Sequence, residues 1–134
     1  MENNGGAFGM LYLFVGLAGA LGSMLRYGVG ILLFPADAVF PFSTLTVNLI
    51  GSFLLAWLTK HLFTNLNIPT TAKTAIGTGF VASFTTFSTL SVETIELVEN
   101  GMLILASLYI LVSILGGLSM SMLGFHTAER RKKK

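Results

Sequence analysis

Long runs without a charged residue are the feature that most limits what this chain can fold into. Four such runs cover residues 3–25, 38–59, 74–92 and 100–128. About 20 consecutive apolar residues suffice for a helix to cross the hydrocarbon core of a membrane. The runs therefore predict an all-α fold with four membrane-spanning helices.

The predicted spans lie at residues 8–33, 41–63, 72–98 and 102–125, followed by a basic tail at 126–134. Proline, asparagine and glycine, which break helices, lie in the gaps between the spans. No soluble domain remains outside the spans, so we expect a single membrane domain.

Composition excludes several classes of protein. Only 10% of the residues are charged and 53% are hydrophobic, whereas a soluble domain carries about 25% charged residues. A soluble enzyme, a disordered regulator and a nucleic-acid-binding domain are therefore not expected. The chain has no cysteine, so disulfides and thiol chemistry are excluded as well.

The distribution of Lys and Arg predicts the orientation in the membrane. Seven of the eight lie at Lys60, at Lys73 or in the tail, on the surface that carries both chain ends. Arg26 is the one cation near the other surface. Positively charged flanks favour the cytoplasmic side, so both termini are predicted in the cytoplasm, below a bacterial-type cytoplasmic membrane.

Two polar residues in the first two spans are candidates for function, because polar groups are costly inside a bilayer. Arg26 either extends to the membrane surface or acts as a fixed cation that attracts anions or holds a partner helix. Asn48 lies near the centre of the second span, with Thr44 and Gly51 on the same face. Its amide either joins two helices or offers donors to a polar path.

The third span has the most unusual composition. Six of the nine residues from Ser83 to Ser91 are Ser or Thr. This segment is either a Ser/Thr-rich packing helix or a helix that breaks at mid-membrane, where freed backbone groups can meet an ion. Near its end we expect Glu96 and Glu99 to form a solvated rim, and Glu93 to lie deeper with a partner.

In the fourth span, Tyr109 and Ser113 add hydroxyls to an inward-facing stripe. The intramembrane polar groups are thus mostly hydroxyls and one amide, with aromatic rings, and no carboxylate lies at mid-span. Such a lining fits a small anion that accepts hydrogen bonds, and argues against proton coupling through Asp or Glu.

Three motifs resemble the Fluc or CrcB fluoride channel family along nearly the whole chain. They are Gly19–Tyr27 (GALGSMLRY), Pro41–Phe53 (PFSTLTVNLIGSF), and Gly79-Phe80 followed by Thr85–Thr89 (TTFST) and Glu93. The resemblance implies an antiparallel dimer of four-span subunits that exports fluoride passively through narrow pores at the dimer interface.

The resemblance also implies residue roles. The fluoride pore is expected to be lined by Asn48, Thr44, Phe87, Ser88, Thr89, Leu90, Tyr109 and Ser113. Arg26 and Glu93 are expected to have electrostatic or structural roles. A structural sodium ion, not transported, is expected on the backbone carbonyls of Ala82 and Thr85.

Three departures from the family pattern matter. Ala82 and Ser83 stand where the family usually has two glycines, which restricts the backbone around the sodium site. Leu90 replaces the second pore phenylalanine, so the pore that uses this position should be weakened. The strong Lys/Arg bias suits one orientation only, so we hypothesise pairing with a second, oppositely oriented homologue.

Two other functions stay open for the sequence. One is a small multidrug-type proton-coupled antiporter, although such exporters use a carboxylate in the first span, which this chain lacks. The other is a non-conducting structural subunit of a heterodimeric channel. Enzyme activity is not expected, because no nucleophile–base pair or metal-ligand cluster is visible.

Overall fold

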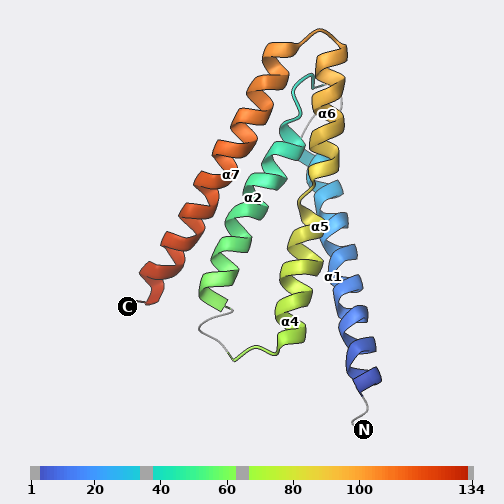
Figure 1. Cartoon of the computed structure of the whole chain (residues 1–134), viewed down its shortest axis with the longest axis vertical. Coiled ribbons are helices and arrows are strands. Elements are labelled where there is room, and N and C mark those ends of the chain that lie inside the picture. Colours follow the sequence, from blue (N-terminus) through green and yellow to red (C-terminus); the bar gives the residue numbers. More distant parts are fainter. Residues whose placement is uncertain (1–3, 34–37, 63–66, 133–134) are drawn as a thin grey trace.

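The computed structural model describes residues 4–33, 38–62 and 67–132, which form four long helical segments (Figure 1). The first segment is α1 (Asn4–Leu33), and the second is α2 (Phe42–Trp57) continued by the π-helical η1 (Leu58–Leu62). The third comprises α4 (Thr70–Thr74), the π-helical η2 (Ala75–Val81), α5 (Ala82–Phe84) and α6 (Phe87–Glu99). The fourth is α7 (Leu103–Lys132). The predicted all-α class is confirmed for the described residues.

Among the residues that the structure describes, four helices are long and apolar enough to cross a membrane. They span Phe8–Leu33, Phe42–His61, Thr70–Glu99 and Leu103–Glu129. The last helix continues as α7 to Lys132 and so includes most of the predicted tail. It continues because no helix breaker follows and because cations are favourable at a helix C-terminus. The predicted end of the second span at residue 63 and tail residues 133–134 lie outside the described residues.

The segments pack in two pairs. α2 lies against α7, and α1 lies against η2 and α5. Small residues let these pairs approach: a Cβ added at Gly79 would lie 2.8 Å from the Val15 carbonyl oxygen, and one at Gly116 would lie 2.8 Å from Leu49. This matches the role of small residues between membrane helices.

The chain ends and the turn between α6 and α7 lie at opposite ends of the bundle (Figure 1). The start of α1, the end of α7 and the start of α4 lie toward one end, and the turn between α6 and α7 lies at the other (Figure 1). Gly101 makes that turn with a φ of +76°, a conformation that glycine adopts without strain. The adjoining Met102 N–H donates to the Leu97 carbonyl at 2.8 Å, which closes the helix end.

Candidate functional site

The third helical segment is broken at mid-length. α5 ends at Phe84, and the next two residues are extended, Thr85 with φ −82° and ψ 160° and Thr86 with φ −150° and ψ 127°. α6 then begins at Phe87, and the Thr86 hydroxyl caps it by accepting from the Thr89 N–H at 3.2 Å. The sequence left two interpretations of this Ser/Thr-rich segment, a packing helix and a broken helix, and the structure shows the broken helix.

Asn48 supplies the hydrogen bonds that the helix break leaves unmade. Its Nδ2 donates to the Thr86 carbonyl oxygen at 2.9 Å, and its Oδ1 accepts from the Thr86 N–H at 2.8 Å. The side-chain amide therefore pairs with one residue of the break through both of its polar atoms. A backbone group left unpaired at this depth would be costly, so Asn48 joins α2 to the break and keeps one Nδ2 hydrogen for another acceptor.

Two further residues lie against the break. Arg26, half-buried in α1, places Nη1 at 3.4 Å from the Thr85 carbonyl oxygen, a long and weak hydrogen bond. Gly51 of α2 faces the Thr85 methyl group so closely that an added Cβ would collide with it. Arg26 thus contacts the break of the third helical segment, and its electrostatic or structural role stays a prediction.

Glu93 joins three helices through its carboxylate. Thr44 of α2 donates to Oε1 at 2.8 Å, and Tyr109 of α7 donates to Oε2 at 2.7 Å. Tyr109 has no exposed surface, and Phe40 meets its ring edge-on at 5.5 Å between centroids. Glu93 therefore has the partners expected of a deeper carboxylate, while Glu96 and Glu99 are exposed as predicted.

Two cavities adjoin the break, and both include Thr86. The first, about 450 Å³, is lined by Asn48, Ser52, Ala82, Thr85, Phe87 and Leu90 among others. The second, about 530 Å³, is lined by Arg26, Thr44, Thr89, Glu93 and neighbouring residues. The break thus brings most of the sequence-predicted site residues together, divided between two hollows.

The predicted pore residues of α6 and α7 differ in how far they are buried. Phe87 is 81% exposed, and Ser88 and Thr89 are exposed beside it, so this face of α6 lies on the surface of the subunit. Leu90 packs against the core cluster that contains Tyr109. Ser88, Tyr109 and Ser113 line neither cavity. The Ser113 hydroxyl is buried without a hydrogen-bond partner among the described residues, which leaves a donor unused inside the bundle.

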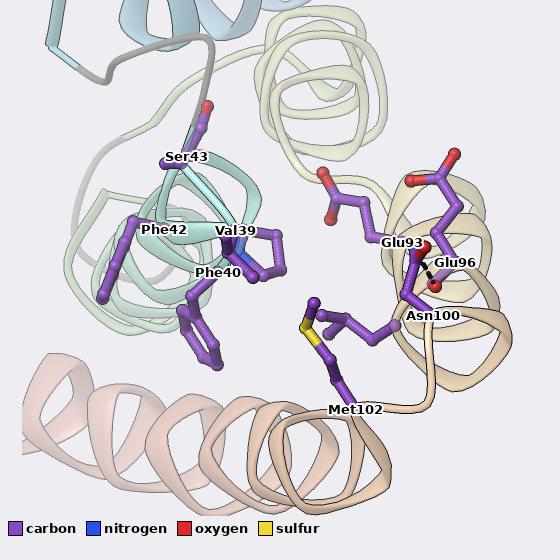
Figure 2. A pocket seen from close by; sticks show the side chains of 11 residues that line it. Val39, Phe40, Phe42, Ser43, Glu93, Glu96, Asn100 and Met102 are labelled. Carbon is purple, nitrogen blue, oxygen red and sulfur yellow. Dashed lines mark hydrogen bonds between the residues drawn. The ribbon is translucent and has the colours of Figure 1, made fainter.

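A third cavity of about 430 Å³ lies where α2 begins and α6 ends (Figure 2). Figure 2 shows Phe40 and Met102 on one side of it and the carboxylates of Glu93 and Glu96 on another. Asn100 donates to the Glu96 backbone carbonyl at 2.8 Å and so fixes the end of α6. Glu93 borders both this cavity and the one beside Arg26.

A cation is predicted at the carbonyl oxygens of Ala82 and Thr85. The Ala82 oxygen accepts a long hydrogen bond of 3.4 Å from the Thr85 hydroxyl, and the Thr85 oxygen accepts one of 3.4 Å from Arg26. Bonds of this length leave the oxygens with acceptor capacity, and backbone oxygens suit hard cations. The Arg26 guanidinium is itself positive, so a sodium ion at Thr85 would share that oxygen with another cation. No cluster of three or more His, Asp or Glu side chains suited to a metal occurs among the described residues.

Thr86 is the site residue that sequence reasoning did not single out. Its backbone meets Asn48, its hydroxyl caps α6, and it lines both cavities. The available signal was a threonine three residues before Thr89 at the start of a helical stretch, a pattern typical of N-caps.

Comparison with known proteins adds to this geometry. Residues 13–125 match the family model described as "CrcB-like protein, Camphor Resistance (CrcB)". The chain is 59% identical to the fluoride-specific ion channel FluC 1 of Desulfitobacterium hafniense, over 84% of this chain and 97% of that protein. It is 48% identical to FluC 2 of Geobacillus kaustophilus, over 93% and 98%, and 50% identical to FluC 1 of Bacillus anthracis, over 93% and 92%.

Proposed function

The chain belongs to the CrcB-like family, and from this premise we propose that it is a fluoride-specific ion channel that lets fluoride leave the cell passively. The observation that carries the proposal is the 59% identity to a fluoride channel over 97% of that channel's length. The relatives are ion channels and not enzymes, in agreement with the sequence prediction. A multidrug antiporter is therefore set aside.

The chemistry of the break suits fluoride. Fluoride is small and holds its water tightly, so a selective path has to replace that water with closely placed donors. The second Nδ2 hydrogen of Asn48 and the exposed hydroxyl of Thr89, which accepts from the Thr86 hydroxyl, are such donors. The exposed Ser88 hydroxyl lies beside them, 3.3 Å from the Thr86 hydroxyl. The edge of the Phe87 ring carries partial positive charge and adds a weaker attraction. We assign the fluoride path to this face, with Leu90 at its border. Tyr109 and Ser113, the other two predicted hydroxyls, lie away from this face: Tyr109 donates to Glu93, and the Ser113 hydroxyl is buried without a partner among the described residues.

An antiparallel dimer completes the path. Phe87, Ser88 and Thr89 are exposed on the isolated subunit, so only a partner surface can turn their face into an enclosed pore. A structural sodium ion held by the Ala82 and Thr85 carbonyls would sit beside this face and supply positive charge without being transported. The clustering of Lys and Arg on the membrane surface that carries both chain ends supports a cytoplasmic location for the two termini.

Two features favour a second, oppositely oriented homologue as the partner. Seven of the eight Lys and Arg residues flank one membrane surface, which suits a single orientation. Leu90 stands where the family has a pore phenylalanine and has no positive ring edge to offer an anion. In such a heterodimer only one pore needs to conduct, and this chain then acts partly or wholly as its structural subunit.

Efflux from liposomes that hold this chain together with the oppositely oriented homologue tests the pore assignment. Asn48→Asp and Phe87→Ile are expected to lower fluoride efflux at least about tenfold, the effect of roughly 1.4 kcal/mol on a barrier. Phe8→Ile is the matched control, because Phe8 is also exposed, at 55%, but lies far from the break in the first turns of α1. Unchanged efflux in both pore variants would show that the pore is elsewhere.

Reconstitution of the chain by itself tests the partner assignment. Weak fluoride efflux from the chain alone, raised by the oppositely oriented homologue, is expected. Robust efflux from liposomes that contain only this chain would refute the heterodimer.

A further inference from the structure

The Thr86 hydroxyl lies at the centre of a small hydrogen-bond network where α6 begins. It accepts from the Thr89 N–H at 3.2 Å and donates to the Thr89 hydroxyl oxygen at 3.0 Å. The Ser88 hydroxyl lies 3.3 Å from it. Ser88 and Thr89 are exposed on the face assigned to the fluoride path, whereas Thr86 is half-buried behind them. The side chain that connects the two exposed hydroxyls therefore belongs to the break itself.

The number of lone pairs fixes the direction of each hydrogen bond in this network. A hydroxyl has one hydrogen and two lone pairs. The Thr86 hydrogen is used on Thr89, so the contact between Thr86 and Ser88 requires Ser88 to donate. Thr86 then accepts from Ser88 and from the Thr89 N–H, which fills both of its lone pairs. The hydrogen of the Thr89 hydroxyl therefore cannot turn back onto Thr86.

The helix break also removes the usual backbone acceptor of the Thr89 hydroxyl. Ser91 and Thr94 of the same helix donate to carbonyl oxygens one turn earlier, at 3.0 and 2.7 Å, as hydroxyls in helices often do. For Thr89 the residue one turn earlier is Thr85, which is extended and whose carbonyl oxygen accepts from Arg26. Within the described part of the chain, the Thr89 hydroxyl accepts a hydrogen bond and donates none.

Thr86 holds a second donor through its backbone. Its N–H and carbonyl oxygen pair with the Asn48 amide at 2.8 and 2.9 Å, which leaves one Nδ2 hydrogen of Asn48 unused. Asn48 lines one of the two cavities beside the break, Thr89 lines the other, and Thr86 lines both. One residue thus positions an amide donor with its backbone and a hydroxyl donor with its side chain.

We propose that Thr86 is the positioning residue that keeps the Thr89 hydrogen available to fluoride. The proposal rests on the fluoride channel function and adds a residue that acts through another. A donor that is already aimed at the ion has no bond within the protein to break before it binds, which is the advantage of a preorganised site. Without the Thr86 hydroxyl, Thr89 and Ser88 lose their common partner, and the direction of the Thr89 hydrogen is no longer set.

A double-mutant cycle of fluoride efflux tests this role, in liposomes that hold the chain together with the oppositely oriented homologue. Thr89→Val and Thr86→Val are each expected to lower efflux about tenfold, near the low end for a hydrogen bond to a charged group. In the Thr89→Val background, Thr86→Val should lower efflux by less than about twofold further, because the donor that Thr86 positions is already absent. Ser91→Ala is the matched control and should leave efflux unchanged, since the Ser91 hydroxyl donates within its own helix.

The cycle separates positioning from a purely structural role. The Thr86 oxygen also caps α6 by accepting from the N–H of residue 89, and that N–H is still present in Thr89→Val. A role limited to capping would therefore make the two losses multiply. Thr86→Asn is a second variant, because an asparagine oxygen caps a helix but has no hydrogen to give to Thr89. It should lose efflux as Thr86→Val does, whereas Thr86→Ser keeps the hydroxyl and should retain the parent efflux.

The outcomes distinguish this proposal from the channel function on which it rests. Losses that multiply in the double variant, or undiminished efflux in Thr86→Val and Thr86→Asn, would overturn the positioning role and leave the channel function standing. A parent that releases no more fluoride than protein-free liposomes would overturn the channel function, and the positioning role with it.

Discussion

Replacing Asn48 with alanine removes both hydrogen bonds that α2 makes to the broken third segment. The Thr86 carbonyl and N–H lose partners at 2.9 and 2.8 Å. Hydrogen bonds between helices in a membrane protein contribute about 0.6 kcal/mol each on average. A buried backbone group left without a partner costs about 1–3 kcal/mol. Two such bonds are lost, and water from the adjoining cavity compensates in part. We therefore expect the free energy of unfolding to fall by about 1–3 kcal/mol.

Unfolding by sodium dodecyl sulfate in mixed micelles measures this loss without relying on ion transport. Ser52→Ala is the matched control, because the Ser52 hydroxyl lies one turn away on the same helix and donates at 2.8 Å to the Asn48 carbonyl of its own helix. We expect that control to change stability by less than about 0.5 kcal/mol, as for substitutions away from special contacts. A loss in Asn48→Ala no larger than in Ser52→Ala would refute the bridging role of the amide.

Three further predictions concern the same region. Gly51→Ala should destabilise the chain by about 1–3 kcal/mol through overpacking against the break. Gly16→Ala is the control and should not, because the space around Gly16 is open. Equal effects of the two changes in the same unfolding titration would contradict the close contact at Gly51. Tyr109→Phe should cost about 1–3 kcal/mol because one Glu93 oxygen loses its donor, and an unchanged unfolding midpoint would contradict that. Leu90→Phe should raise fluoride efflux from liposomes holding this chain alone, and an unchanged rate would show that Leu90 does not limit conduction.

The sequence predicted the four spans because an unpaired charge in a bilayer is costly, so the charge-free runs reveal the helices directly. The break was one of two readings of the Ser/Thr-rich stretch, and the extended backbone at Thr85 and Thr86 decides between them. The expectation that Glu93 has partners is confirmed by its bonds to Thr44 and Tyr109.

Other features could not be read from the sequence because they depend on how the helices are placed relative to one another. The pairing of Asn48 with Thr86 requires the centre of α2 to lie level with the break, and no sequence pattern gives that level. Tyr109 was assigned to a hydroxyl lining, yet its hydroxyl is taken up by Glu93 in the isolated subunit. The sequence also did not predict that α7 continues into the basic tail, because the predicted span ended with the last apolar run.

The central claim, that this chain forms a fluoride-specific channel, is tested most directly by comparing fluoride and chloride efflux from the same liposomes. The measurement uses the purified chain alone and together with its oppositely oriented homologue, with ion-selective electrodes for both anions. The account predicts fluoride efflux well above that of protein-free liposomes, with chloride retained. Equal release of both anions, or no fluoride release in either preparation, would contradict it.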